Sequence, residues 1–415
     1  MTMQIYGATY LAPVSSPPVS GGAIAVTDGR IVDVGPIDRL RREYGGEVRE
    51  FPGCVILPGL VNAHSHLELT HFPSWKLRKG IDYSPRTYVD WVIQIIKIRR
   101  ALTRMELEHS VLEGIRVSLE CGTTTIGEII TERELIPLYE TTPIGGRLYL
   151  EAIGQDPART GPLLDELEMT MQSFADGRLR AGLSPHAPHT LSAPFLKGLA
   201  GLAARHSLPT AVHLSESREE EAFMADSSGR IAELLYPFAG WETYLPPPRH
   251  TTSAAYLESL GLLNASTSVV HCVHVTLDDV HILKKRGVSV ILCPRSNERL
   301  AVGKAPAALF KKCGVPLALG TDSLASNDSL SLWDEMRFLL NEFPTVFSPE
   351  EALEMATIGS ARALHLDGET GSLEKGKRAD FLVAHLSRNA SSTELAEALI
   401  DDSRLVEVYI GGKPV

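Results

Sequence analysis

Histidine and aspartate residues recur in this sequence at the points where short apolar runs end. Each run is typical of a buried strand, so the polar residues would lie together wherever the strand ends meet. The residues at these ends are His64, His66, His186, His213, His271 and Asp322. Because residues two apart in a strand point to the same side, His64 and His66 can direct both imidazoles at one point. A single histidine is more simply explained by packing, but packing gives no reason for histidine at so many strand ends.

Three of these imidazoles and the carboxylate form a ligand set for one divalent metal ion. We expect His64, His66 and His213 to contribute nitrogen atoms. Asp322 would contribute oxygen. Zn²⁺ suits neutral imidazole and carboxylate ligands, and Fe²⁺ and Mn²⁺ are alternatives. Asp322 also has a simpler interpretation, since an aspartate that directly follows a strand can cap the next helix.

Glu216 lies three residues after His213 and opens the acidic run ESREEE (216–221). Its place just beyond the strand lets the carboxylate turn back over the site and act as an acid or a base. The alternative is a solvated surface charge. We apply that alternative to Glu219, Glu220 and Glu221 rather than to Glu216.

Eight strand candidates alternate with segments of helical composition, such as 89–102, 106–120 and 305–314. Alternating strands and helices argue for a parallel sheet, and eight units argue for a closed (β/α)₈ TIM barrel. A doubly wound open sheet is the alternative, but no Gly-x-Gly-x-x-Gly turn follows an early strand. The eight runs are VNAHSH (61–66), TTTIGEI (123–129), GRLYLEAI (146–153), LRAGLSPHA (179–187), LPTAVHLSE (208–216), STSVVHCVH (266–274), GVSVILCPRS (287–296) and VPLALGTDS (315–323).

The two ends of the chain have a different pattern, with short strand-like runs punctuated by Gly, Pro and Asp-Gly. Chain termini often lie close together, so we expect both ends to form one small β-sandwich domain. The expected boundaries are 1–58 and 366–415 for the two parts of this domain, and 59–365 for the barrel.

Composition limits the partners of the protein. Among 415 residues, 40 Lys and Arg oppose 51 Asp and Glu, for a formal net charge of −11. This balance argues against binding to nucleic acid or to an anionic membrane surface.

No apolar run is long enough for a transmembrane helix, and the first residues do not resemble a signal peptide. Five scattered cysteines fit reduced thiols in a cytoplasmic protein. Assembly into a homo-oligomer stays open, since no long apolar stripe points to an interface.

Several segments resemble the amidohydrolase superfamily, and in particular its branch of aminohydrolases and chlorohydrolases. The matching segments are PGLVNAHSHLELT (58–70), GLSPHAP (182–188), HLSES (213–217), HCVHV (271–275), CPRSN (293–297) and LGTDSLASNDSLSLWDEMRFL (319–339). The resemblance covers most of the chain and implies the barrel, the small β domain and a metal-dependent hydrolase. Members with two metals need a carbamylated lysine at the end of the fourth strand. LRAGLSPHA contains no lysine, so one metal is expected.

The resemblance also implies a role for each residue. The metal ligands of the family match His64, His66, His213 and Asp322. Glu216 matches the carboxylate that carries protons, and His271 matches a histidine that helps to polarise the water or the substrate. Asp322 would also take part in catalysis by accepting the proton of the water. His186 matches a histidine that often contacts the substrate.

Substrate selection is expected from the long connections 71–89 and 217–262, which in a barrel lie on the catalytic face. The residues predicted to contact substrate are His186, Trp75, Arg86, Asn297 and Asn327. Tyr88 and Trp91 are further candidates, although the helical spacing of Trp91 and Ile95 better suits a core position.

The function predicted from the resemblance is hydrolytic deamination of an aminated purine nucleoside or a related heterocycle. The small-molecule substrate would be a heterocyclic amine such as S-adenosylhomocysteine or aminodeoxyfutalosine, and HLELT, VDWV, SREEEAF and CPRSN are most similar to aminodeoxyfutalosine deaminases. One alternative is hydrolysis of another C–N or C–Cl bond, in a triazine, a guanidine or a cyclic amide. A catalytically inactive binding protein is a further alternative, disfavoured because all four ligands and Glu216 are present.

Overall fold

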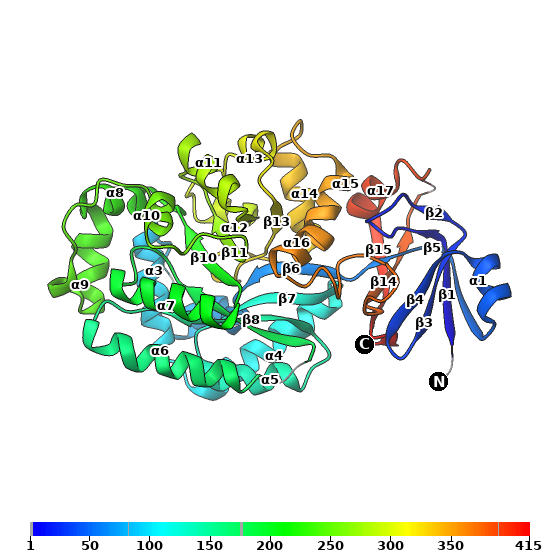
Figure 1. Cartoon of the computed structure of the whole chain (residues 1–415), viewed down its shortest axis with the longest axis horizontal. Helices are drawn as coiled ribbons and strands as arrows, with labels where there is room; N and C mark the ends of the chain where they lie inside the picture. The colour runs from blue at the N-terminus through cyan, green and yellow to red at the C-terminus, as the bar shows by residue number, and fades with distance from the viewer. Residues whose placement is uncertain (1–2, 82, 175–176, 389) are drawn as a thin grey trace.

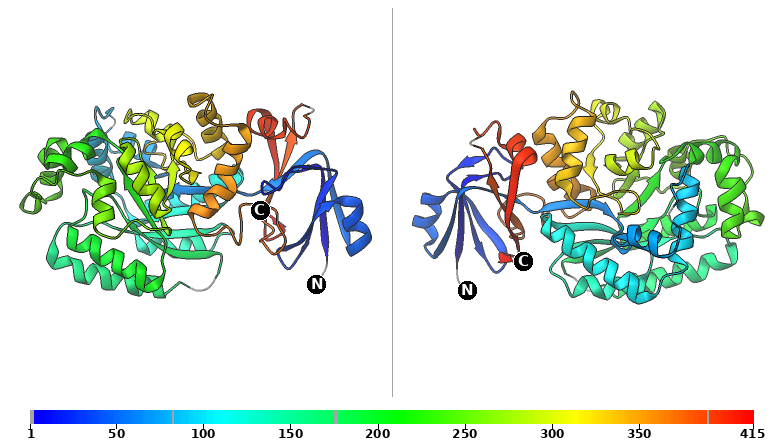
Figure 2. Two further views of the ribbon diagram at one scale, coloured as in Figure 1. Left: turned by 45° about the horizontal axis from the view of Figure 1, so that its top comes forward. Right: turned by 180° about the vertical axis from the view of Figure 1, so that it is seen from behind.

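Two lobes make up the molecule, a larger barrel and a smaller sheet formed by both ends of the chain (Figure 1). This computed structural model describes residues 3–81, 83–174, 177–388 and 390–415. Both chain ends lie in the smaller lobe, to one side of the barrel, in the further views of Figure 2. The prediction of a barrel with a small β domain built from both termini is therefore confirmed.

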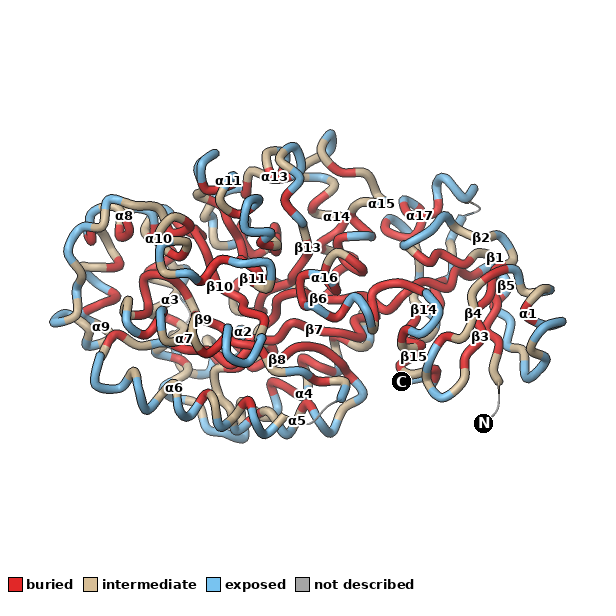
Figure 3. Tube along the Cα trace, viewed as in Figure 1, coloured by how far each residue is buried: buried red, intermediate tan, exposed pale blue. Residues whose placement is uncertain are grey.

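Eight parallel strands form the barrel, hydrogen-bonded in chain order from β6 to β13. They are β6 (Leu60–Ser65), β7 (Thr123–Ile130), β8 (Gly145–Ala152), β9 (Leu179–Pro185), β10 (Thr210–Leu214), β11 (Thr267–His271), β12 (Ser289–Leu292) and β13 (Leu317–Leu319). Each overlaps one of the eight predicted runs. The strands are buried along nearly their whole length, as the red tube in Figure 3 shows. Parallel strands covered on both faces are apolar throughout, which explains why these runs were visible in the sequence.

The barrel closes where β6 meets the residues that follow β13. The Asn62 amide donates to Thr321 Oγ1 at 2.7 Å, and the Thr321 N–H donates to Asn62 Oδ1 at 3.1 Å. The Asp322 N–H then donates to the His64 carbonyl oxygen at 3.0 Å. Gly320 permits this close approach, because a Cβ at that position would lie 2.7 Å from the Cβ of His64. The contacts that close the barrel therefore also place Asp322 beside His64.

Helices cover the outside and the base of the barrel. The outer helices are α4 (Arg104–Glu120), α5 (Ile136–Glu140), α6 (Pro157–Gln172), α7 (Ala193–His206), α11 (Leu277–Arg286), α12 (Pro294–Arg299), α13 (Ala307–Cys313) and α14 (Leu332–Glu342). The base is covered by α15 (Pro349–Glu354), a π-helical turn (Met355–Gly359) and α16 (Ser360–Ala363). Arg147, inside the barrel, donates from Nε to the carbonyl oxygen of Leu364 at 2.8 Å and so ties β8 to this base.

Both long connections fold into helices, most of which lie on the side of the barrel away from the terminal sheet (Figure 1). The first contains α2 (Phe72–Arg78) and leads into α3 (Tyr88–Arg99). The second contains α8 (Arg218–Asp226), a π-helical turn (Ile231–Leu235), α9 (Tyr236–Ala239) and α10 (Ser253–Ser259). Tyr88, Phe223 and Tyr236 share one apolar cluster, so α3, α8 and α9 pack together as a cap.

The smaller lobe is one curled sheet in the order β16-β15-β14-β5-β1-β3-β4, with β2 beside β1. Its elements are β1 (Gln4–Leu11), β2 (Val19–Ser20), β3 (Gly22–Thr27), β4 (Arg30–Pro36), α1 (Ile37–Tyr44), β5 (Glu47–Pro58), β14 (Phe381–Leu386), α17 (Leu395–Asp402), β15 (Ser403–Ile410) and β16 (Lys413–Pro414). Tyr6, Ile56 and Phe381 belong to one buried cluster, which joins the two chain ends. The boundaries at residues 58 and 365 stay predictions. Within the described ranges, no helix is long and apolar enough to cross a bilayer.

Candidate active site

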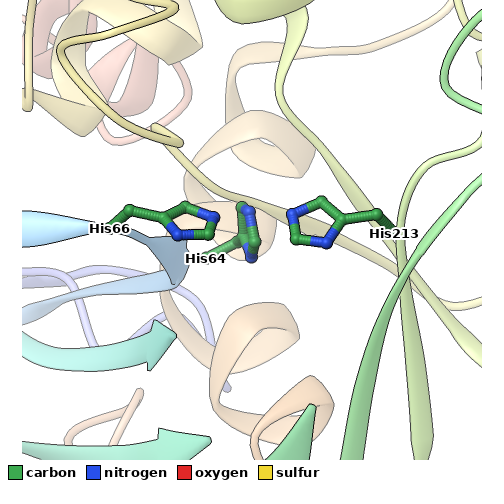
Figure 4. A group of neighbouring side chains, drawn as sticks. All are labelled: His64, His66 and His213. Carbon is green, nitrogen blue, oxygen red and sulfur yellow. The ribbon is translucent and has the colours of Figure 1, made fainter. Parts of the chain in front are cut away.

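The three predicted histidine ligands meet at the carboxyl ends of β6 and β10. His64, His66 and His213 each offer a ring nitrogen, and these atoms lie within 4.8 Å of one another. Figure 4 shows His64 between His66 and His213, with the three rings drawn toward one another. Asp322 Oδ1 lies 3.7 Å from Nε2 of His64 and 3.7 Å from Nε2 of His66. The four predicted ligands are therefore gathered around one point.

The hydrogen bonding of this cluster fits a divalent cation. His64 is fully buried, and neither of its ring nitrogens has a hydrogen-bond partner among the described residues. A buried imidazole without partners is costly, and a bound cation would supply the missing partner. His213 Nδ1 donates a hydrogen bond to the carbonyl oxygen of His186 at 3.0 Å. The other ring nitrogen, Nε2, then carries no proton and can coordinate a metal ion. Burial lowers the pKa of both His66 and His213, which keeps the rings in the neutral form that binds metal.

Asp322 is oriented by two serines. Its Oδ2 accepts from Ser296 Oγ at 2.7 Å and from Ser326 Oγ at 2.6 Å, so Oδ1 is the oxygen turned to the histidines. The backbone of Asp322 has a φ of 57°, and that of His271 has a φ of 70°. Left-handed backbone in such residues costs about 1–3 kcal/mol and persists where surrounding contacts enforce it. Here it turns both side chains from their strand ends into the mouth of the barrel.

Glu216 and His271 face each other beside the cluster. Glu216 Oε1 lies 3.7 Å from His271 Nε2, and both side chains are buried. Burial, and then the charge of Asp322, raise the pKa of Glu216 to about 8, while a hydrogen bond with Tyr88 acts in the opposite direction. Glu216 is therefore mostly protonated at neutral pH. His271 Nδ1 donates to Asn297 Oδ1 at 2.9 Å, so Nε2 of the neutral ring is an acceptor.

Glu220 corrects one sequence-based interpretation. It was expected to be a solvated surface charge, but it is buried. Its carboxylate accepts from the backbone N–H of Ser215 at 2.8 Å and of Glu216 at 3.2 Å, and also from the hydroxyl of Ser253. Ser215 has a φ of 50°, so Glu220 holds a strained turn that carries Glu216. The physical reason is that two buried backbone N–H groups need hydrogen-bond acceptors. Glu220 turns inward from the run ESREEE and accepts from both of them.

Two other buried glutamates hold segments of the site in the same way. Glu128 accepts from Ser65 Oγ at 2.6 Å and from the Leu67 N–H at 2.7 Å, on either side of His66. Glu335 accepts from the Asn327 amide at 2.7 Å in the loop that follows Asp322. Sequence reasoning missed both. The signal for Glu128 is an acidic residue inside an otherwise apolar run, since carboxylates are rarely buried without donors. Glu335 directly follows Asp334 and carries no such signal.

Replacement of Glu220 by glutamine is expected to destabilise the fold by about 1–3 kcal/mol, because one buried N–H loses its acceptor. Turnover should also fall, since the turn that carries Glu216 is released. Denaturant unfolding and kcat would measure the two effects. Glu221→Gln is the matched control, because the Glu221 side chain is 59% exposed in the same run. Equal stability of the two variants would contradict this positioning role.

A cavity of about 380 Å³ opens above the cluster, a size within the usual range for small-molecule sites. Its floor contains His66, His213, Glu216, His271 and Asp322. Its apolar wall comes from the cap and includes Trp91, Val92, Ile95, Ile96, Leu235 and Trp241. Its polar edge includes Arg99, Arg100, Glu132, Glu151 and His186. The arrangement suits a flat apolar group that reaches down to the cluster.

Two residues predicted to contact the substrate, Trp75 and Arg86, come before α3 in the first long connection. Trp75 is only 3% exposed and packs in the apolar cluster with Phe72 and Ile98. Arg86 is exposed on the surface. Among the described residues, neither belongs to the cavity lining. Trp91, for which helical spacing favoured a core position, packs against the apolar cluster of the cap and also lines the cavity, and its Nε1 donates to the Ala325 carbonyl oxygen at 3.1 Å. An aromatic side chain of α3 therefore forms part of the cavity wall.

Asn297 and Asn327, which were also predicted to contact the substrate, make hydrogen bonds to other side chains of the site. Both are buried, and neither lines the cavity in the part of the chain that the structure describes. Asn297 orients His271, and Asn327 donates to the Thr321 carbonyl oxygen at 2.8 Å and to Glu335. These contacts engage the side-chain oxygen of Asn297 and the side-chain nitrogen of Asn327, so both residues support other groups of the site. His186 does line the cavity, and burial together with His64 lowers its pKa to about 4. Its contact with substrate stays a prediction.

Comparison with known proteins gives consistent matches over most of the chain. A model described as the amidohydrolase family matches residues 55–415, and one described as an imidazolonepropionase-like composite domain of bacteria matches residues 22–46. A Syntrophobacter fumaroxidans protein named 5-methylthioadenosine/S-adenosylhomocysteine deaminase is 30% identical, covering 93% of this chain and 88% of its own. A Deinococcus radiodurans protein named aminodeoxyfutalosine deaminase is 29% identical, covering 86% and 84%. The crystal structure of a Xanthomonas campestris adenosine deaminase with bound zinc is 25% identical, with a TM-score of 0.78, covering 99% and 92%.

Proposed function

The chain belongs to the amidohydrolase family, and from this we propose that it is a metal-dependent deaminase of an aminated purine nucleoside or a related heterocycle. It is a hydrolase that acts on carbon–nitrogen bonds other than peptide bonds and releases ammonia. One observation carries the proposal: a buried Glu216 faces His271 beside a histidine cluster at the floor of a substrate-sized cavity. The names of the relatives support an adenosine derivative as the substrate.

The proposed metal is one Zn²⁺, for which His64, His66, His213 and Asp322 are the right donor types. The zinc bound in the adenosine deaminase from Xanthomonas campestris supports this choice. When bound, the metal supplies an ionised water at neutral pH as the nucleophile. The remaining steps belong to side chains of the protein.

Proton movements follow from the geometry of three residues. Asp322 Oδ1, the oxygen not engaged by the two serines, can accept a proton from the attacking water. His271 Nε2 is an acceptor that can orient the same water. Glu216 then donates its proton to the ring nitrogen, where negative charge develops as the ring carbon is attacked. The C–N bond breaks as the leaving amino group takes the proton held by Asp322, so that ammonia departs. The hydroxyl proton left on the ring carbon then passes to the Glu216 carboxylate, which restores its acid form. Acid–base help of this kind contributes about 10²–10⁴-fold in rate.

Ammonia release tests the proposed function. The zinc-loaded protein would be offered adenosine, 5′-methylthioadenosine, S-adenosylhomocysteine, aminodeoxyfutalosine, guanine, cytosine and an aminotriazine. Rapid release from one adenosine derivative is the expected result. Release only from the aminotriazine would show that the same site acts on the alternative substrate class. No release from any compound, with metal bound, would overturn deamination.

The pH dependence of kcat is expected to report Glu216. The group acts as an acid, so it must be protonated, and its pKa is raised to about 8. Below that pH, ionisation of Glu216 should therefore not lower kcat. Well above that pH, kcat should fall about tenfold per pH unit. Ammonia assays from neutral pH upward would measure the profile, and the residual activity of Glu216→Gln should lack this decline. If Glu216→Gln shows the same fall of kcat at the same pH, the fall must come from another titrating group.

We further propose a cytoplasmic location, supported by five cysteines that are all free thiols in the structure. The absence of nucleic-acid partners stays a prediction from net charge. Homo-oligomer formation also stays open.

A further inference from the structure

Tyr88, at the end of the first long connection, contacts the proposed acid, Glu216. It is the first residue of α3, its side chain is buried, and it lines the same cavity as Glu216. Its hydroxyl forms a hydrogen bond with the Glu216 carboxyl. The two residues are far apart in the sequence, and the packing of α3 against the second long connection brings them together.

The first turn of α3 is held by the second connection. Thr87, the N-cap, accepts from the Asp90 N–H at 3.2 Å and from Arg230 Nε at 3.1 Å. Arg230 also donates to Asp90 Oδ1 at 2.6 Å, and it directly precedes the π-helical turn of that connection. These bonds fix the turn that carries Tyr88, and with it the place of the hydroxyl above Glu216.

The Glu216 carboxyl has no other hydrogen-bond partner among the described residues. Its Oε1 lies 3.7 Å from His271 Nε2, which is too long for a hydrogen bond. Glu220 accepts from the backbone N–H of Glu216, but several rotatable bonds separate that backbone from the carboxyl. Glu220 therefore holds the base of this side chain, and Tyr88 holds its tip.

The direction of the hydrogen bond follows from its two partners. A buried phenol needs an acceptor, and in the part of the chain that the structure describes Tyr88 finds one in Glu216. Burial raises the pKa of Tyr88 well above its ordinary value, so the phenol keeps its proton to donate. A carboxyl offers an acceptor oxygen whether it is protonated or ionised. Tyr88 can therefore donate to Glu216 in both states.

We propose that Tyr88 is a positioning residue for the proton transfer: its hydroxyl holds one oxygen of Glu216 so that the other faces the reacting end of the substrate. This inference rests on the proposed function. Tyr88 acts through Glu216 and moves no proton itself. Because α3 also contributes Trp91 and Ile95 to the cavity wall, one helix both confines the substrate and orients the acid.

Tyr88→Phe tests this role, because it removes only the hydroxyl and the ring lines an open cavity. We expect kcat at neutral pH to fall about tenfold, with little change of KM. Donation from Tyr88 stabilises ionised Glu216, so its loss raises the pKa of Glu216. The fall of kcat at alkaline pH should therefore begin about one pH unit higher than in the wild type. Ammonia release from the best nucleoside of the panel would measure both effects.

Tyr236→Phe is the matched control. Tyr236 belongs to the same cap cluster, is 1% exposed and donates from its hydroxyl to the His189 carbonyl oxygen at 3.0 Å. Among the described residues, it is not part of the cavity lining. Denaturant unfolding should show a loss of stability in this variant, while its pH profile should match the wild type. Both variants keep His271, Asp322 and Glu219, the other groups that act on the Glu216 carboxyl.

Two results for Tyr88→Phe would overturn the positioning role. A purely structural role predicts a lower kcat with the alkaline fall at the wild-type pH. Displacement of that fall to lower pH would mean that Glu216 donates to Tyr88 instead of accepting from it.

The double variant with Glu216→Gln separates an indirect role from a direct one. Once the acid is removed, Tyr88 has no proton carrier left to orient. The kcat of the double variant should therefore equal that of Glu216→Gln alone. A further tenfold loss would mean that Tyr88 acts on the substrate directly, and it would overturn the inference.

The outcomes also separate this inference from the proposed function. Deamination that Tyr88→Phe leaves unaltered in rate and in pH profile overturns the positioning role and keeps the deaminase. No deamination of any nucleoside by the wild type overturns both.

Discussion

Replacement of Glu216 by glutamine is expected to lower kcat by about 10²–10⁴-fold while metal content and fold stay unchanged. Glutamine has nearly the same volume as glutamate and keeps an oxygen that can accept the hydrogen bond from Tyr88. It cannot carry a proton to the ring nitrogen. Glu216 is not one of the metal ligands, so its loss should leave the histidine cluster intact.

Three measurements would check this result on one preparation. Ammonia release gives kcat, elemental analysis gives bound zinc, and denaturant unfolding gives the free energy of unfolding. Glu221→Gln removes an exposed carboxylate from the same acidic run and should behave as the wild type. Wild-type turnover in Glu216→Gln, with zinc bound, would show that another group moves the proton.

Replacement of His66 by alanine is expected to abolish both turnover and the stabilisation that zinc gives to the wild type. A ligand that binds only the folded state stabilises it by about 4 kcal/mol when its free concentration is roughly 1,000-fold above its dissociation constant. The wild type should gain this amount, because zinc would also provide partners for the buried nitrogens of His64. His66 lines the cavity, so truncation enlarges an open space instead of creating a closed void.

Unfolding curves with zinc and with a chelator would measure the effect. His250→Ala is the control, since the His250 side chain is 75% exposed and lies outside the cluster. It should keep the full zinc-dependent stabilisation. A similar gain of stability in His66→Ala would mean that zinc binds elsewhere. Full turnover after exhaustive chelation would contradict a metal-dependent reaction.

The apolar runs and the residues that follow them were enough to predict the barrel and the place where the proposed metal ligands meet. Parallel barrel strands are buried on both faces, so each of the eight appears as an apolar run whatever surrounds it. The catalytic face lies at the carboxyl ends of these strands, so residues that follow the runs must come together. His64, His66, His213 and Asp322 could be selected on that basis, and the structure gathers them around one point.

The tertiary structure alone decided which side chains line the cavity and which support it. From the sequence, Trp75 was the predicted substrate contact and Trp91 the better candidate for the core, but α2 turns Trp75 into an apolar cluster while Trp91 of α3 lines the cavity. Asn297 and Asn327 follow strand ends as the ligands do, yet their amides are taken by His271 and Glu335.

The physical reason is that burial and hydrogen bonding depend on partners far away in the chain. Glu220 is held by Ser253, 33 residues later, and Glu128 is held by Ser65, 63 residues earlier. Glu151 and His186 face the same space only because β8 and β9 are neighbours in the closed sheet. Local periodicity in the sequence shows where a strand ends. Whether a side chain then contacts a ligand or supports its neighbours depends on the donors and acceptors that the fold brings within reach.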